Sequence, residues 1–224
     1  MKLSAKTVAI VIGCAVFIGL PLLFYGLGDV PRRSLLKEVL SVLTLLAFSL
    51  MLGQFYLARS NEVVLELFKP PEIQKVHKFI AYGAVIIILL HPALIVLPRF
   101  FEAGIKPWDA FVTMVTTFDS AGVLLGLVGW ALLLVVLLTS MFRMRLIKRF
   151  GIKYRTWRYV HGGLTVTFVV IGIWHSIDLG RHTDVAMAIY MITLAAIGTL
   201  MLGQLYWADM SKTVKKPLPK GEKS

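Results

Sequence analysis

The chain has 224 residues, of which 58% are hydrophobic and only 16% are charged, and its mean hydropathy is +0.79. A soluble domain of this size cannot bury so much apolar surface, which favours a protein that lies in a lipid bilayer. The net charge of +12 is spread between apolar runs, so we interpret it as a topology signal and predict no nucleic-acid partner. The single cysteine, Cys14, excludes an internal disulfide, a CxxC redox pair and an iron–sulfur cluster held by this chain alone.

Six runs without Asp, Glu, Lys or Arg follow one another along the chain. They cover residues 7–28, 39–58, 79–98, 120–142, 159–177 and 185–208. About 20 apolar helical residues, rising about 1.5 Å each, cross a hydrocarbon core of about 30 Å. The pattern predicts an all-α integral membrane protein with a bundle of six transmembrane helices. The first run follows Lys2 and Lys6 as a signal peptide would, but it has no clear cleavage site, so we expect it to be retained.

The basic residues predict the orientation of the chain. Eighteen of the 24 Lys and Arg residues lie in the N-terminus, the second and fourth loops and the C-terminal tail. The positive-inside rule then predicts a multi-pass protein of the inner (plasma) membrane with both termini in the cytoplasm. We expect residues 1–208 to form the transmembrane domain and residues 209–224 to form a disordered, basic cytoplasmic tail.

Four histidines occur with one repeated spacing. His77 and His91 are 14 residues apart around the third run, and His161 and His175 are 14 apart around the fifth. Fourteen helical residues advance about 21 Å and complete nearly four turns, so both histidines of each helix share one face. The third and fifth helices run in the same direction. The pattern therefore predicts two stacked pairs, His77 with His161 on the cytoplasmic side and His91 with His175 on the outer side.

Two imidazoles at each level indicate haem rather than another metal. The levels are about 21 Å apart, so one ion cannot reach all four residues. Zinc and copper sites usually need three or four close ligands, whereas haem iron needs two axial ones. We predict that His77, His91, His161 and His175 are the metal ligands of two haem b groups stacked between helices three and five. The alternative is that the histidines form structural hydrogen bonds between helices.

Other residues near these positions support weaker hypotheses. Phe168 is seven residues from both His161 and His175 and should lie between the two haems, or simply in the core. Nearby glycines could permit close approach of a flat ring or ordinary helix packing; they are Gly83, Gly162, Gly163 and Gly172. We expect His182, which has no partner at matching spacing, to be a solvated loop residue. Gln54 and Gln204 lie in two similar segments, MLGQFYLA and MLGQLYWA. We interpret both glutamines as anchors at the membrane interface rather than as cofactor contacts.

The chain resembles the ferric reductase-like transmembrane domain superfamily in its paired histidines and in the segment KYRTWRYVH, residues 153–161, which ends at His161. That superfamily includes NADPH oxidases, ferric-chelate reductases and the haem subunit of a periplasmic methionine sulfoxide reductase system. The resemblance covers roughly residues 35–180. It implies that electrons pass from a cytoplasmic flavin through an inner haem at His77 and His161 and an outer haem at His91 and His175. No catalytic residue is implied in this chain.

The resemblance also bears on the partners. About 15 residues follow the sixth run, and no Gly-rich dinucleotide loop is present, so we expect the flavin on a separate partner. The expected donor is a cytoplasmic flavoprotein reductase or a membrane quinol. The expected acceptor is oxygen, a ferric chelate or an outer-side protein. The chain would then be the electron-transfer subunit of an oxidoreductase. The alternatives are a quinol-linked cytochrome b and a non-redox membrane protein with structural histidines.

Basic residues precede the inner-level histidine His161. Those of the fourth loop, residues 143–155, have two possible roles. They fix the topology and contact anionic lipid headgroups, or they additionally steer an acidic flavoprotein to the protein. Arg158 lies just inside the apolar boundary, where a cation needs an anionic partner. We therefore predict that Arg158 binds an inner-haem propionate.

Overall fold

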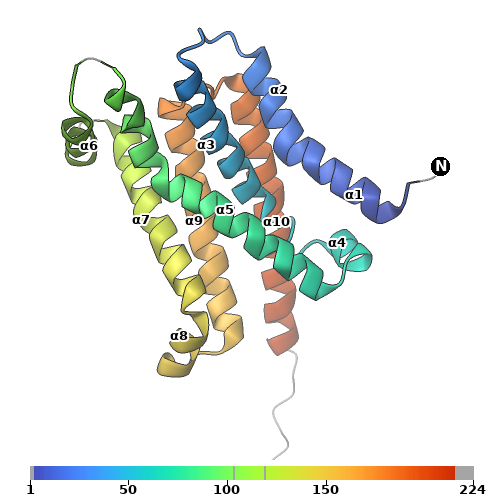
Figure 1. Cartoon of the computed structure of the whole chain (residues 1–224). Coiled ribbons are helices and arrows are strands. Elements are labelled where there is room, and N and C mark those ends of the chain that lie inside the picture. The colour runs from blue at the N-terminus through green and yellow to red at the C-terminus, as the bar shows by residue number, and fades with distance from the viewer. Residues whose placement is uncertain (1–2, 103, 119, 215–224) are drawn as a thin grey trace, which may run out of the picture.

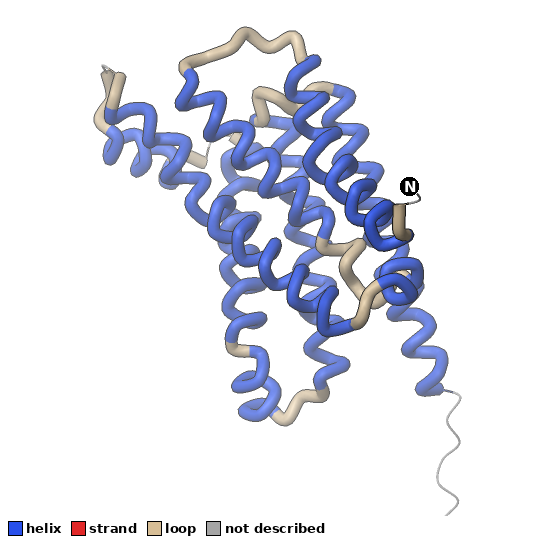
Figure 2. The backbone as a smooth tube through the Cα atoms, turned by 45° about the vertical axis from the view of Figure 1, so that its right-hand side comes forward, coloured by secondary structure: helices blue, strands red, loops and turns tan. Residues whose placement is uncertain are grey.

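The computed structural model describes residues 3–102, 104–118 and 120–214, and every regular element in those residues is a helix (Figures 1 and 2). The elements are α1 (Ala5–Cys14), η1 (Ala15–Gly19), α2 (Leu20–Leu27), α3 (Leu35–Gly53), α4 (Glu62–Leu67), α5 (Pro70–Val96), η2 (Leu97–Phe100), α6 (Pro107–Thr116), α7 (Ala121–Met141), α8 (Arg143–Phe150), α9 (Tyr154–Leu179) and α10 (Val185–Val214). Among the described residues, six helical segments are long and apolar enough to cross a membrane. They confirm the predicted all-α, multi-pass membrane protein.

The six spans overlap the six apolar runs, and several of them extend beyond their run into charged sequence. The fifth span begins at Tyr154 instead of residue 159, and the sixth helix reaches Val214. Long basic side chains at helix ends can reach the headgroup region, so the helix outlasts the apolar run. The tail predicted at 209–224 therefore starts within α10, and its residues 215–224 lie outside the described residues.

The first span is broken by a π-helical segment. Ala15–Gly19 forms η1 between α1 and α2, and Pro21 has no N–H to donate to the carbonyl of Phe17. The Ser49 hydroxyl donates to that carbonyl at 2.8 Å, and the Tyr190 hydroxyl donates to the Val16 carbonyl at 3.0 Å. Because an unpaired carbonyl is costly in lipid, these two hydroxyls from α3 and α10 stabilise the break.

The core lies among α3, α7, α9 and α10, and α5 runs obliquely across their face (Figure 1). Its fully buried side chains are aliphatic, sulfur-containing or small, and include Leu52, Leu133, Val169, Met187 and Met191. The outward faces are equally apolar, as expected where lipid is the solvent.

Helix pairing sets the space around the histidines. Helix α5 packs mainly on α3, and α9 packs mainly on α7. The two histidine-bearing helices, α5 and α9, contact each other far less than they contact these neighbours. A cavity between these helices is lined by His91 and His175.

Candidate cofactor site

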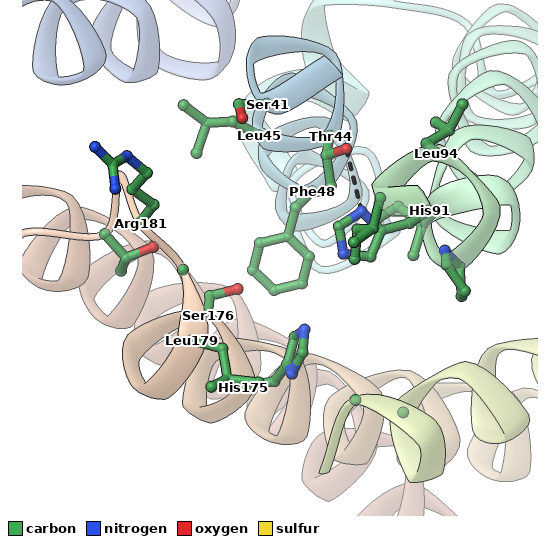
Figure 3. Close-up of a pocket in the computed structure, with 18 of the residues that line it drawn as sticks. Ser41, Thr44, Leu45, Phe48, His91, Leu94, His175, Ser176, Leu179 and Arg181 are labelled. Carbon is green, nitrogen blue, oxygen red and sulfur yellow. Dashed lines mark hydrogen bonds between the residues drawn. The ribbon is translucent and has the colours of Figure 1, made fainter. Parts of the chain in front are cut away.

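The structure brings His91 of α5 and His175 of α9 together. Their ring centroids are 6.4 Å apart, and the rings are nearly perpendicular, at 85°. Figure 3 shows the two imidazoles on opposite sides of a pocket, with Phe48 between α3 and α9 beside them. The 14-residue spacing alone could not show this meeting, because it also depends on how α5 crosses the bundle.

Neighbouring groups orient both outer imidazoles in the same way. Nδ1 of His175 lies 2.8 Å from the Gly122 carbonyl oxygen and donates to it. The Thr44 hydroxyl donates to the Leu40 carbonyl at 2.9 Å, so its oxygen is free to accept from Nδ1 of His91 at 3.3 Å. Each Nε2 is then the unprotonated nitrogen, which is the tautomer that binds a metal. Histidine ligands in metalloproteins characteristically donate their second N–H to such a partner.

The distance between the outer rings fits one metal ion between them. A metal–nitrogen bond of about 2.0–2.1 Å and about 1.1 Å from the nitrogen to its ring centre place each ring centre about 3.2 Å from a shared metal, so two such rings would be about 6.3 Å apart. The observed separation is 6.4 Å. If the Nε2 atoms of His91 and His175 held one iron, a haem would supply its remaining four nitrogen ligands. The donor set and the spacing at this level therefore fit a haem.

A cavity of about 460 Å³ opens beside the outer pair. Aromatic and aliphatic side chains line its inner part, among them Phe48, Phe168 and Ile88. Cationic side chains line its outer end, namely Arg33, Lys37 and Arg181. An apolar slot with cations at its mouth matches the two ends of a haem, whose ring is apolar and whose propionates are anionic.

Close packing at the outer pair depends on glycine. A Cβ at Gly126 of α7 would lie 2.7 Å from the His175 ring, so only glycine allows this ring position. A Cβ at Gly172 would meet Phe48, and one at Gly162 would meet Tyr206, so these two glycines admit neighbouring side chains. Around Gly83 and Gly163 no atom lies within 4 Å of an added Cβ. Gly126 was not among the residues that the sequence singled out.

The inner pair is arranged differently. His77 and His161 are both half-buried and lie within electrostatic range of each other, but no ring contact joins them in the described residues. The Ser140 hydroxyl donates to the Val136 carbonyl at 2.7 Å and accepts from Nδ1 of His161 at 3.2 Å. His161 is therefore oriented like the outer histidines, whereas no hydrogen bond to the His77 ring is found there.

The other predicted residues have specific surroundings. Phe168 is 3% exposed, lines the outer cavity and contacts the Phe48 ring edge-on at 6.3 Å. Arg158 binds the Asp209 carboxylate at 2.9 Å, while its buried Nε has no partner in the described part of the chain. Asp209 thus supplies the anionic partner that a cation at this depth needs, and one donor of Arg158 remains available.

The expectation for His182 was wrong. Its side chain is only 9% exposed, and its ring lies 4.6 Å from that of Tyr25. Nε2 of His182 is 3.4 Å from a Glu38 carboxylate oxygen, although the angle is not that of a hydrogen bond. Burial lowers the pKa of His182 and outweighs the opposing effect of the Glu38 carboxylate. Sequence spacing could not reveal this, because Glu38 and Tyr25 come from distant helices.

In residues 3–102, 104–118 and 120–214, no group of three or more His, Cys, Asp or Glu side chains could hold a metal ion. The fold and the facing histidines define a polytopic helical membrane protein with a paired-imidazole site. The model for the ferric reductase like transmembrane component matches residues 43–172. The chain therefore belongs to the ferric reductase-like transmembrane family, as its paired histidines predicted.

The chain also has a curated relative of similar length. The chain is 39% identical over 173 residues to an uncharacterized protein of Archaeoglobus fulgidus, and the match covers 77% of this chain and 92% of that protein. No solved structure matches the chain. Membership of this redox family indicates transmembrane electron transfer.

Proposed function

We propose that the chain is a dihaem cytochrome b that carries electrons across the inner (plasma) membrane. Its proposed ligand pairs are His77 with His161 for the inner haem and His91 with His175 for the outer haem. The single observation that carries the proposal is the outer pair, whose rings are 6.4 Å apart with both Nδ1 atoms hydrogen-bonded away from the space between them. Family membership supports it.

A haem held by one of these histidine pairs would supply one-electron, outer-sphere redox chemistry. The residues of the chain hold the ligands in place for this. Thr44, Ser140 and the Gly122 carbonyl keep three of the four imidazoles in the tautomer that presents Nε2. Phe48 and Phe168 exclude water from the slot between α3, α5 and α9. Arg158, held by Asp209, has a buried Nε–H without a partner in the described residues, which would be available to an inner-haem propionate.

The proposed donor is a cytoplasmic flavoprotein that carries the flavin. Helix α8 supports this side of the proposal, because Arg145, Lys148 and Arg149 form no ion pair within the described residues. Unpaired cations on one helix attract an acidic partner. With both termini cytoplasmic, α8 faces that donor, and the outer cavity faces an acceptor that is oxygen, a ferric chelate or an outer-side protein.

The decisive experiment is a visible spectrum and a pyridine haemochrome assay of the purified protein. We expect a b-type spectrum and close to two haems per chain. A purified, folded chain that binds no haem would instead support a non-redox membrane protein with structural histidines. Reduction by a quinol without any flavoprotein would support the quinol-linked alternative. A preparation competent in electron transfer but saturated at one haem would overturn the two-level arrangement.

A further inference from the structure

Three rings form a continuous stack at the cytoplasmic end of α9. Tyr154 and Trp157 lie 5.7 Å apart between ring centroids at 19°, and Trp157 and His161 lie 5.1 Å apart at 14°. They occupy positions three and four residues apart, which share one face of a helix. We call these three residues the α9 ring stack. It runs from the surface to an inner-level histidine, because Tyr154 is 44% exposed and Trp157 is only 9% exposed.

Contacts from two other elements hold the α9 ring stack in place. The Trp157 indole N–H donates to the Thr139 carbonyl of α7 at 3.3 Å, and His161 is bound to Ser140 of the same helix. The Arg143 guanidinium lies over the other two rings of the stack, 5.6 Å from the Tyr154 centroid and 5.2 Å from the Trp157 centroid. Cation–π contacts of this kind favour a fixed ring position. These contacts therefore stabilise the near-parallel stacking of Tyr154 on Trp157 and of Trp157 on His161.

We propose that the α9 ring stack is the route by which electrons enter the protein from the cytoplasm. One electron would pass from the reduced donor across Tyr154 and Trp157 to an iron held by His161, so that the donor would be oxidised by one electron and that iron reduced by one. Neither ring changes its oxidation state. The inference deepens the proposed function, because it rests on an inner haem at His161.

The position of the α9 ring stack supports this role over simple packing. Its exposed end lies beside α8, because Arg143 is the first residue of that helix and covers Tyr154. A donor drawn to Arg145, Lys148 and Arg149 would therefore dock next to Tyr154. Among the described residues, His175 at the outer level has a ring contact with His91 alone. The stack is thus specific to the level nearest the proposed donor.

The test places a photosensitiser beside the stack. The chain has one cysteine, so Cys14→Ser with Lys153→Cys allows a single ruthenium complex to be attached next to Tyr154. After a flash, we expect fast haem reduction in this parent. Tyr154→Leu and Trp157→Leu should each lose the fast phase, whereas Tyr154→Phe and Trp157→Phe should keep it. Phe150→Leu is the matched control, because Phe150 is 68% exposed nearby and outside the stack, and its rate should equal that of the parent.

A second measurement needs no haem. In labelled, haem-free protein, a flash followed by an external quencher produces oxidised ruthenium, which takes one electron from Trp157. Transient absorption should show a tryptophan radical that is absent in Trp157→Phe and that appears more slowly in Tyr154→Leu. Equal kinetics in Tyr154→Leu and the parent would overturn the route.

The outcomes separate this inference from the proposed function. A parent that binds no haem contradicts the proposed function itself. Normal haem content and equal flash-induced rates in the parent and both leucine variants overturn the entry route and leave the proposed function standing. Where Trp157→Leu loses haem because His161 has moved, Tyr154→Leu decides, since Tyr154 does not contact His161.

Discussion

The two histidine levels have the same sequence spacing but different structures. At the outer level, His91 and His175 face each other at 6.4 Å, and partners from α3 and α7 orient both rings. At the inner level only His161 is oriented, by Ser140, and its ring stacks on Trp157. Both rings of the outer pair are therefore held in position, whereas in the inner pair a hydrogen bond orients His161 alone among the described residues. Equal spacing in sequence does not produce equal preorganisation.

The strongest test of this comparison is removal of each ligand. We expect His91→Ala and His175→Ala to lose or weaken the same haem, and His77→Ala and His161→Ala the other, because the two histidines of a pair would hold one iron. Haemochrome content and low-temperature spectra of the four variants measure this. One identical single-haem spectrum from His77→Ala and His175→Ala would show that the pairing is wrong.

Gly126→Ala should disrupt the outer level alone. The added Cβ would lie 2.7 Å from the His175 ring, so the imidazole must move from its position opposite His91. We expect loss of most of the outer haem with the inner haem retained, measured by haem content and spectrum. Gly203→Ala is the matched control, because an added Cβ there meets nothing within 4 Å. Unchanged outer-haem content in Gly126→Ala would contradict the role of this close approach.

Removing the hydrogen-bond partners should weaken binding without abolishing it. Loss of such a partner lowers metal affinity by about 10–100-fold. Ser140→Ala should weaken the inner haem more than Thr44→Val weakens the outer one, because Ser140 is the sole partner of an inner-level imidazole in the described structure, while His175 keeps the Gly122 carbonyl. Competition of each variant with an apo-haemoprotein measures the two affinities. A larger loss of haem affinity in Thr44→Val than in Ser140→Ala would contradict the proposed difference between the two levels.

Charge reversal on α8 should affect only the inner level. We expect Arg145→Glu with Lys148→Glu to slow haem reduction by a flavoprotein, while dithionite reduction and haem content stay unchanged. Steering by exposed charges is screened over about 8–10 Å, so the effect should fade as ionic strength rises. Stopped-flow reduction over a range of salt concentrations measures it. Equal rates for variant and parent at low salt would leave α8 with a topological role alone.

The smallest expected effect concerns His182, at the rim of the outer level. Burial lowers its pKa in the folded protein, so the unfolded chain binds the proton more readily. His182 should therefore reduce stability as the pH falls below its unfolded pKa of about 6.5. We expect the Tm in detergent to fall less between about pH 7 and pH 5 in His182→Gln than in the parent. An identical pH dependence in both proteins would contradict this.

Much of the architecture could be predicted because it depends on local periodicity. Apolar runs of about 20 residues must form helices that satisfy their own backbone in lipid, so all six spans were predictable. The 14-residue spacing likewise places His77 and His91 on one helix face. The helical extensions at Tyr154 and Val214 and the short helix α8 were missed, because charged residues interrupt the apolar runs there.

The sequence by itself determined the six spans, the family and the placement of the two histidines of each helix on one face, because hydropathy and helical spacing act within single segments. The tertiary structure decided which rings meet, since that depends on how α5 crosses the bundle and on which helices flank it. It also decided that Gly126, Thr44 and Ser140 hold the imidazoles, that Arg158 pairs with Asp209, and that His182 is buried against Glu38. Each of these contacts joins residues from different segments of the chain, where sequence spacing carries no information about distance.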